Sequence, residues 1–541
     1  ASAELDEKKL RLMDEYERRR NDPKRQLNSQ IGEDVQVRVT IAENAEPGVH
    51  YWRLQTKSGL SNPMRFVVGE HAEFNEPEPW RFDLMKFIGL DSNSSSDSRR
   101  DQGSSLVTLP ATVNGRILPG EVDEFTFEAT EGEQVVISVE ARHLIPYLAD
   151  AVPGWFQAVV SLHDPRGQEL AFADDYRFDP DPVLFYKIPR TGEYRLRVRD
   201  SIYRGREDFV YRVTIGELPF LTGISPLGAR AGTEVDLTFH GGNLDEQTKT
   251  RHPIPDTAGL IDLFATGPSG RSNAIAFHVD SVPEDKERED NNRLGAANEI
   301  EVPGIINGAL TLPGDVDFFR VQGTGNQPMS FEIFGRRLGS PIDANLTVYD
   351  DDGKMIAFND DNENPAAGLT THHADPRVFI KLPDNGRCFI RVADTQNRYG
   401  YANAYRLKVS QEPPRFVLRT TPSSLNAKPG TSARLTVHAL RIDGFDGPVA
   451  LSLKDAPAGF SLNATIPAGE DMADVSISVP AEPPSQPTRL TVQGTAEIEG
   501  KSVSIDAVPA EDMMQAFIYR HLVPVDALMV DVRTPPEKPA P

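Results

Sequence analysis

The chain repeats itself, and this repetition constrains its fold more than any other feature. The segment Leu109 to Glu217 reads a second time as Val302 to Glu412, with "VNGRILPGEVDEFTF" answered by "INGALTLPGDVDFFRV". A shorter repeat alternates with it, because "SGLSNPMRFVV" (Ser58 to Val68) matches "SGRSNAIAFHV" (Ser269 to Val279). Repeats of this length are domains rather than solenoid units. We therefore predict small and large modules in alternation.

The residue pattern within each module indicates β-structure. Short stretches such as "EFTFEA", "QVVISVEA" and "YRLRVRD" alternate apolar and polar residues, and Gly, Pro and Asp separate them at the spacing of β-sandwiches. Residues 3–20 differ, because Leu5, Leu12, Met13 and Tyr16 fall on one helical stripe. The predicted fold class is all-β, with tandem β-sandwiches and a short N-terminal helix.

The same patterns predict module boundaries. We expect an N-terminal helix and connector over 1–34, a partial small module over 35–70, a linker over 71–105, the first large module over 106–217, a small module over 218–281, the second large module with an acidic linker over 282–412, a last module with a C-terminal extension over 413–532, and a disordered tail over 533–541. The first small module has only the closing half of the second. Half a sandwich leaves strand edges unpaired, so we expect a partner chain or another segment to complete it, or the opening strands to have been removed.

Composition excludes several classes of protein. The chain has 541 residues, too many for one core, and a formal net charge of −24, which would repel nucleic acid. It has no run of 18 apolar residues, so no membrane span is expected. The opening "ASAELDEKK" lacks the apolar core of a signal peptide, which fits a processed or partial chain. The single cysteine, Cys388, rules out an internal disulfide and is expected in a core.

Specific motifs resemble known families. "GDVDFF", "YDDDGKMIAFNDD" and the closing "FIRVAD…YRLKV" make the large modules similar to bacterial pre-peptidase C-terminal (PPC) domains. The small modules resemble IPT/TIG-type immunoglobulin-like domains. The last module, with "AVPAEDMMQAFIYRHLVP", has an immunoglobulin-like rhythm and resembles the C-terminal part of large exported proteins of planctomycete-type bacteria. The resemblance implies jelly-roll-like sandwiches, export, and a role in targeting, substrate binding or assembly.

The strongest site candidate is a calcium site at the entry to the second large module. The candidate ligands come from "EREDNN" and "PGDVDFF", and they are Glu287, Glu289, Asn291, Asn292, Asp315 and Asp317. Hard cations take six to eight oxygen ligands, and alternation along an extended segment places every second side chain on one side. Resemblance to collagen-binding relatives of PPC domains implies calcium at these positions. The alternative is a solvated acidic linker followed by turn aspartates.

Weaker metal candidates lie elsewhere. The first large module keeps Asp123 but has Glu121 where the second has Asp315. Its "EFNEPEPW" keeps Glu76 and Glu78 but has no asparagine after them. Both large modules also carry an acidic turn, with Asp174, Asp175, Asp179 and Asp181 in one and Asp360 and Asp361 in the other, where His372, His373 and Asp375 follow. Asp is common in tight turns because its side chain bonds the local backbone, so turn chemistry is the alternative.

Catalytic signatures are missing from the sequence. It has no His-Glu-x-x-His, no Gly-x-Ser-x-Gly and no P-loop. We predict a non-catalytic, exported protein of the cell surface, periplasm or extracellular space. Its expected partner is a protein or polysaccharide at the cell surface. Two alternatives stay open: an accessory substrate-binding portion of a larger secreted hydrolase, and a subunit of a complex completed by a partner chain.

Overall fold

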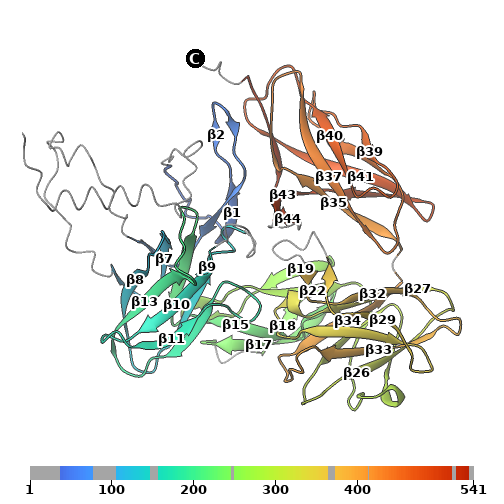
Figure 1. Ribbon diagram of the computed structural model, residues 1–541, viewed down its shortest axis with the longest axis horizontal. Helices are drawn as coiled ribbons and strands as arrows, with labels where there is room; N and C mark the ends of the chain where they lie inside the picture. The colour runs from blue at the N-terminus through green and yellow to red at the C-terminus, as the bar shows by residue number, and fades with distance from the viewer. Residues whose placement is uncertain are drawn as a thin grey trace, which may run out of the picture. The chain divides into compact units, whose positions relative to one another are not determined.

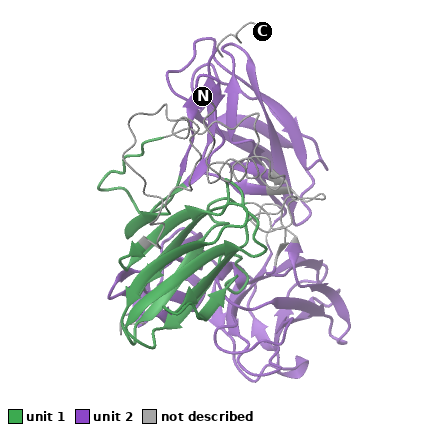
Figure 2. Cartoon of the chain, turned by 60° about the vertical axis from the view of Figure 1, so that its left-hand side comes forward, with its two compact units in different colours: residues 1–50, 66–149, 153–218 green, residues 51–65, 150–152, 219–541 purple. Residues whose placement is uncertain are grey.

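The computed structural model describes residues 37–76, 105–146, 156–244, 249–363, 372–411, 413–514 and 520–534. In these residues the chain is built from β-strands, as predicted, with short 3-10 turns at Leu294–Ala296 (η1) and Arg336–Leu338 (η2) (Figure 1). The helix expected over 3–20 lies outside the described residues, as do residues 535–541 of the expected tail. The chain divides into two compact units, which are residues 1–50, 66–149 and 153–218, and residues 51–65, 150–152 and 219–541 (Figure 2). Within the described residues, no helix has the length and apolarity needed to cross a membrane.

The first large module is a sandwich of two five-stranded sheets. One sheet has the order β11 (Glu169–Ala173), β10 (Ala158–His163), β13 (Gly192–Asp200), β8 (Asp123–Ala129) and β6 (Ser105–Val107). The other has the order β12 (Val183–Lys187), β9 (Gln134–Glu140), β14 (Val210–Gly216), β7 (Ala111–Arg116) and β5 (Ala72–Asn75). The core forms because strands alternate: on β13, Tyr194, Leu196 and Val198 are buried between half-exposed arginines.

The second large module repeats this topology strand for strand. One sheet has the order β24 (Asn298–Ile300), β26 (Asp317–Gln322), β33 (Arg387–Asp394), β28 (Ala344–Tyr349) and β29 (Met355–Asn359). The other has the order β23 (Glu284–Lys286), β25 (Gly304–Ala309), β34 (Ala404–Ser410), β27 (Pro328–Phe334) and β32 (Arg377–Lys381). A separate pair, β30 (Asn362–Glu363) and β31 (His372–His373), forms a small hairpin. Cys388 is fully buried in this core, as expected.

Part of the expected linker over 71–105 belongs to the first sandwich instead. Ala72–Asn75 forms β5, which pairs in parallel with β7, and Phe74 packs against the core. The acidic linker behaves in the same way, because β23 pairs in parallel with β25. Each large module therefore begins by adding an edge strand to its own sheet.

The second small module is a compact pair of three-stranded sheets. Their orders are β15 (Phe220–Ser225), β17 (Glu234–Gly242) and β18 (Lys249–Pro253), and β16 (Gly228–Arg230), β22 (Ile275–Asp280) and β19 (Gly259–Leu263). A hairpin of β20 (Thr266–Gly267) and β21 (Gly270–Arg271) projects from it. Its core includes Leu338 of the second large module, and Asp280 pairs with Lys408 at 2.9 Å. These contacts join the two modules.

The last module is a larger sandwich with its own core. One sheet has the order β40 (Met472–Ser478), β37 (Ser432–Ile442), β35 (Arg415–Thr421), β43 (Val508–Met514) and β44 (Arg520–Pro524). The other has the order β36 (Ser424–Ala427), β45 (Leu528–Val532), β41 (Thr488–Ile498), β38 (Val449–Lys454) and β39 (Ala464–Ile466), with β42 (Lys501–Asp506) paired to β41.

Residues 37–76, the described part of the first small module and its linker, contain two pairs of short strands besides β5. β1 (Gly48–Trp52) pairs with β4 (Met64–Val68), and β2 (Gln55–Thr56) and β3 (Gly59–Leu60) form a hairpin.

Candidate metal centre in the second large module

Three predicted carboxylates converge where the acidic segment passes over the second large module. Glu287 follows β23 directly, and its Oε1 accepts a hydrogen bond from Ala309 N–H at 2.7 Å. Asp317 is the first residue of β26 and is fully buried. Glu287, Glu289 and Asp317 each offer an oxygen within 4.8 Å of the others. The structure thus brings together residues that are 30 positions apart in the sequence.

Asn291 and Asp315 lie beside this group, and we call the five residues the acidic cluster. Asn291 is fully buried, and its side-chain amide lies 2.9 Å from Asp317 Oδ1 and 3.2 Å from Glu289 Oε2. With its nitrogen toward them, the amide donates to both carboxylates. Asp315 accepts from Thr311 N–H at 2.6 Å through Oδ2, whereas its Oδ1 is buried without a hydrogen-bond partner among the described residues. The unpartnered oxygen of Asp315 fits a hard cation.

The sixth candidate, Asn292, has a different role. It is exposed, and its side-chain oxygen accepts a hydrogen bond from Val316 N–H at 3.1 Å. The backbone carbonyl of Asn291 in turn accepts from Phe318 N–H at 3.0 Å. These two bonds hold the acidic segment against the start of β26.

Two residues that contact the acidic cluster were not predicted from the sequence. The hydroxyl of Tyr405, on β34, donates to Asp317 Oδ2 at 2.5 Å and lies 3.2 Å from Glu287 Oε2. Gly308, on β25, lies beneath them, because a Cβ there would be 2.4 Å from Tyr405 Cζ and 2.5 Å from Glu287 Oε2. The repeat carried the signal, since the first copy has Gly115 and Tyr211 at the matching positions.

The electrostatics of the acidic cluster favour either protons or a cation. Burial raises the pKa of Glu287 to about 7, and burial together with the nearby Glu287 charge raises the pKa of Asp317 to about 9. Burial also raises the pKa of Glu289, and the Asp315 charge adds to this. Carboxylates this close cannot all ionise at neutral pH unless a positive charge joins them. The acidic cluster can therefore hold a metal ion.

The first large module repeats part of this arrangement. The Tyr211 hydroxyl donates to Asp123 Oδ2 at 2.5 Å, and Glu76 is hydrogen-bonded to Asp123. Burial and the Asp123 carboxyl raise the pKa of Glu76 to about 9. Glu121 turns back to its own loop and accepts from Leu118 N–H at 2.8 Å. The positions that match Glu289 and Asn291 lie outside the described residues.

The remaining candidates lie at exposed turns. Asp174 and Asp175 follow β11, and Asp360 and Asp361 follow β29. Within the described residues, none of the four belongs to a group of carboxylates close enough to share an ion. Their positions fit the alternative of turn chemistry.

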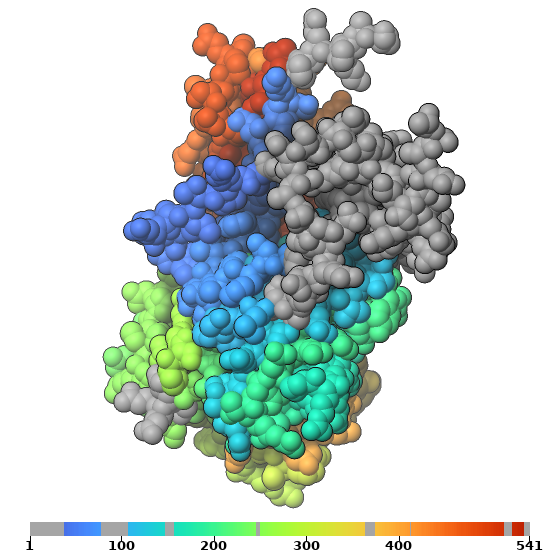
Figure 3. All heavy atoms as spheres, turned by 90° about the vertical axis from the view of Figure 1, so that its left-hand side faces the viewer, coloured from blue at the N-terminus to red at the C-terminus, as the bar shows by residue number. Residues whose placement is uncertain are grey.

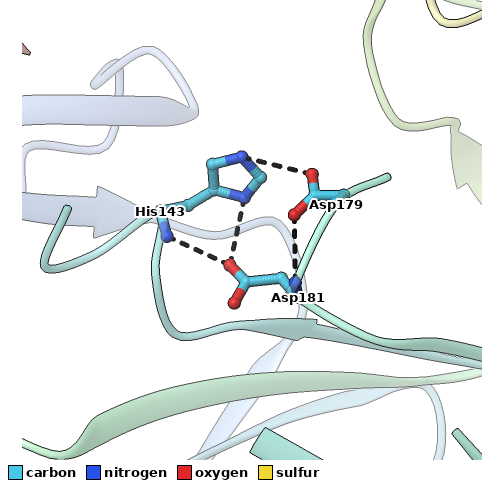
Figure 4. A group of neighbouring side chains, drawn as sticks. All are labelled: His143, Asp179 and Asp181. Atoms are coloured by element: carbon cyan, nitrogen blue, oxygen red, sulfur yellow. Dashed lines mark hydrogen bonds and ion pairs between the residues drawn. The ribbon is translucent and has the colours of Figure 1, made fainter. Parts of the chain in front are cut away.

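Two other aspartates of the first acidic turn, Asp179 and Asp181, form a cluster with His143, which was not predicted from the sequence (Figure 4). His143 Nδ1 lies 3.2 Å from Asp181 Oδ2, and Nε2 lies 3.5 Å from Asp179 Oδ2. Asp181 is buried and accepts from the backbone N–H groups of Ala141, Arg142 and His143 at 2.8–3.0 Å. An acidic partner at each ring nitrogen suits an imidazolium, and the hydrogen bond to Asp181 raises the pKa of His143.

The second copy shows what this cluster does. There Asp375, also fully buried, accepts from the N–H groups of Gly335, Arg336 and Arg337. The Arg337 guanidinium donates to it through Nε at 2.7 Å. An arginine thus occupies the place of His143. We interpret both as loop clamps, in which a buried aspartate closes the turn after β9 or β27 and the chain supplies its own cation.

Gly308→Ala is expected to destabilise the second large module by about 1–3 kcal/mol, because the added methyl overlaps Tyr405 and Glu287. Gly295→Ala is the matched control, since a Cβ at Gly295 has nothing within 4 Å, and its effect should stay within about 0.5 kcal/mol. Urea unfolding of both variants measures the difference. Equal stability of the two would show that the close approach at Gly308 is not required.

Comparisons with known proteins found partial matches only. No family model matches the chain. A Deinococcus radiodurans protein described as a "probable subtilase-type serine protease" is 29% identical over 161 residues, which are 29% of this chain and 20% of that protein. The chain therefore matches about a fifth of that relative.

Solved structures with similar parts include the pre-peptidase C-terminal domain of a Bacillus anthracis collagenase. It is 16% identical, with 21% of this chain and 97% of that domain covered and a TM-score of 0.16. Another is the Aeromonas hydrophila periplasmic inhibitor of g-type lysozyme, also 16% identical, with 21% and 98% covered and a TM-score of 0.14.

Proposed function

We propose that this chain is a non-catalytic, exported binding or structural protein of the bacterial cell surface or periplasm, stiffened by calcium. The observation that carries the proposal is the convergence of Glu287, Glu289, Asn291 and Asp317, with a buried oxygen of Asp315 left without a hydrogen bond. A bound cation would add to the hydrogen bonds that hold the acidic segment against β26 and so stiffen the entry to the module.

Calcium is the ion that this set of atoms suits best. Every side-chain donor is an oxygen, and calcium accepts six to eight oxygens in flexible geometry. Magnesium demands a stricter octahedron, and zinc favours nitrogen and sulfur. Glu287, Glu289 and Asp317 each supply a carboxylate oxygen, and Asp315, water or backbone carbonyls would complete the shell.

The partner is proposed to be a protein or polysaccharide of the cell surface. In the presence of calcium, the purified chain should bind isolated bacterial cell envelopes. It should not hydrolyse protein or polysaccharide substrates. Chelator should weaken the binding. Hydrolysis of either substrate by the purified chain would overturn the non-catalytic assignment.

An accessory role in a larger secreted protease is the second candidate, because the matched relative is described as a subtilase-type protease. In that role the modules bind the polymer that a separate catalytic domain cuts. Fusing the chain to an unrelated protease domain should then lower KM for a polymeric substrate and leave kcat for a short peptide unchanged. A subunit completed by a partner chain would instead appear as a stable hetero-complex in native mass measurements.

Calcium binding is expected to weaken as the pH falls. Without a cation, the pKa values of about 7 for Glu287 and about 9 for Asp317 keep protons on the acidic cluster. Calcium must displace these protons, so its Kd should rise roughly tenfold per pH unit for each proton released. Calorimetric titration at pH 6 and pH 8 in two buffers measures both Kd and proton release. A pH-independent Kd would place the ion elsewhere.

A further inference from the structure

The hairpin of the first small module is held by the last module, although hundreds of residues separate them in sequence. The Arg53 guanidinium, whose side chain is only 7% exposed, donates to Ser424 Oγ at 2.8 Å and to Ala527 O at 2.7 Å. It also pairs with Asp526 at 3.2 Å. A buried guanidinium that donates to several groups at fixed positions makes a contact specific, because its planar fork of N–H groups fits few arrangements of acceptors.

The tip of the hairpin is recognised through its backbone. Leu60 N–H donates to Asn426 Oδ1 at 2.7 Å, and Asn426 Nδ2 donates back to Leu60 O at 3.1 Å. The side-chain amide of Asn426 thus forms the same pair of hydrogen bonds with Leu60 that the backbone of a neighbouring strand would form. Gly59 is buried at a φ of +141°, and a Cβ there would lie 2.5 Å from Asn426 Oδ1, so only glycine fits. On the other side, Arg533 donates to Thr56 O at 2.6 Å.

The second small module provides an internal comparison. Its hairpin has the same build, because Ser61 accepts from Leu54 N–H and Ser272 accepts from Ala265 N–H, both at 2.9 Å. The residues that bind the last module differ: Arg53, Gln55 and Leu60 are replaced by Phe264, Thr266 and Arg271. Gly270 matches Gly59, but a Cβ added to Gly270 would have no atom within 4 Å. Only the first hairpin carries the side chains for this contact.

From these contacts we propose that residues 51–65 are a built-in ligand, and that the last module carries its receptor along β36 and β45. The receptor residues are Ser423, Ser424, Asn426, Asp526, Ala527, Asp531 and Arg533. The occupant is the hairpin of the same chain, because each receptor group meets a matching group of that hairpin. This inference is independent of calcium and of the proposed function.

Trypsin cleavage after Lys57 tests the proposal in the full chain. Lys57 is exposed at the hairpin turn, but a protease needs the hairpin to leave its receptor and open. Asn426→Ala, more than 360 positions away in sequence, should speed this cleavage by roughly tenfold, as should Arg53→Ala. Ser476→Ala, on an exposed position of β40 in the same module, should leave the rate unchanged.

Each outcome decides the proposal. Wild-type cleavage rates in Asn426→Ala, with the melting of the last module unchanged, would show that the hairpin is not docked there. Protection that grows with protein concentration between 1 and 100 µM would show that the hairpin binds a second copy, and would overturn docking within one chain. Protection that is independent of concentration and lost in both variants is the expected result.

Discussion

Calcium is expected to raise the melting temperature of the second large module, and Asp317→Asn is expected to abolish the rise. A ligand that binds only the folded state at 100 times its Kd adds about 2.7 kcal/mol, which is several degrees for a domain of this size. The asparagine keeps an oxygen for the Tyr405 hydroxyl and imitates the protonated Asp317 of the cation-free state. The variant should therefore melt normally in chelator and fail only to respond to calcium.

Asp123→Asn is the matched control for this experiment. Asp123 accepts from Tyr211 in the first large module as Asp317 accepts from Tyr405 in the second. Calorimetric scans with calcium or chelator should show the full calcium response in Asp123→Asn. A response that survives in Asp317→Asn, or that disappears in Asp123→Asn, would contradict the placement of the ion at the acidic cluster.

The all-β architecture could be predicted from two features of the sequence, the alternation along each strand and the repeat. Alternation of apolar and polar residues decides which face of each strand is buried, as on β13, and the repeat shows that one solution is used twice. The edge strands β5 and β23 could not be predicted. They have only four and three residues, too few for a clear alternating pattern, and they are held by parallel backbone pairing with β7 and β25. The sequence therefore indicated linkers where the chain adds strands.

The candidate site was predictable only as far as its charges are close in sequence. Glu287 and Glu289 share one segment and Asp315 and Asp317 share another, so motif and alternation sufficed for them. Tyr405 reaches the same point from β34, and its role depends on the packing of three strands. The loop clamps were missed for a similar reason, since His143 and Asp181 meet only when β9 and the turn before β12 lie together.

Loss of the carboxylate in the first loop clamp is expected to be among the most damaging single changes. Asp181→Ala leaves the N–H groups of Ala141 and Arg142 and the His143 ring without their acceptor. Removing one partner from such a buried charged network typically costs about 3–5 kcal/mol. Urea unfolding should show this loss, whereas Asp174→Ala, an exposed aspartate in a nearby turn, should change stability by less than about 0.5 kcal/mol. A mild effect at Asp181 would mean that the turn after β9 does not depend on it.

The cation of that clamp makes the stability of the first large module depend on pH. The hydrogen bond to Asp181 raises the pKa of His143 above its usual 6.5, and the charges of Asp179 and Glu140 act in the same direction. The contribution of His143 is therefore complete below about pH 6.5 and is lost as the pH rises through the higher folded-state pKa. Because the His143 side chain is 46% exposed, the loss should be only about 1 kcal/mol.

His143→Arg isolates this effect, because it replaces the titrating imidazole with a permanently charged guanidinium, as at Arg337 in the second copy. The difference in unfolding free energy between His143→Arg and wild type should be small at pH 5.5 and should grow in favour of the arginine up to pH 8.5. Taking the difference cancels Glu140 and Asp179, whose pKa values burial also raises. His143→Gln should show the opposite course, less stable than wild type in acid and equal to it at high pH. A constant difference across the range would mean that His143 carries no proton in the folded state.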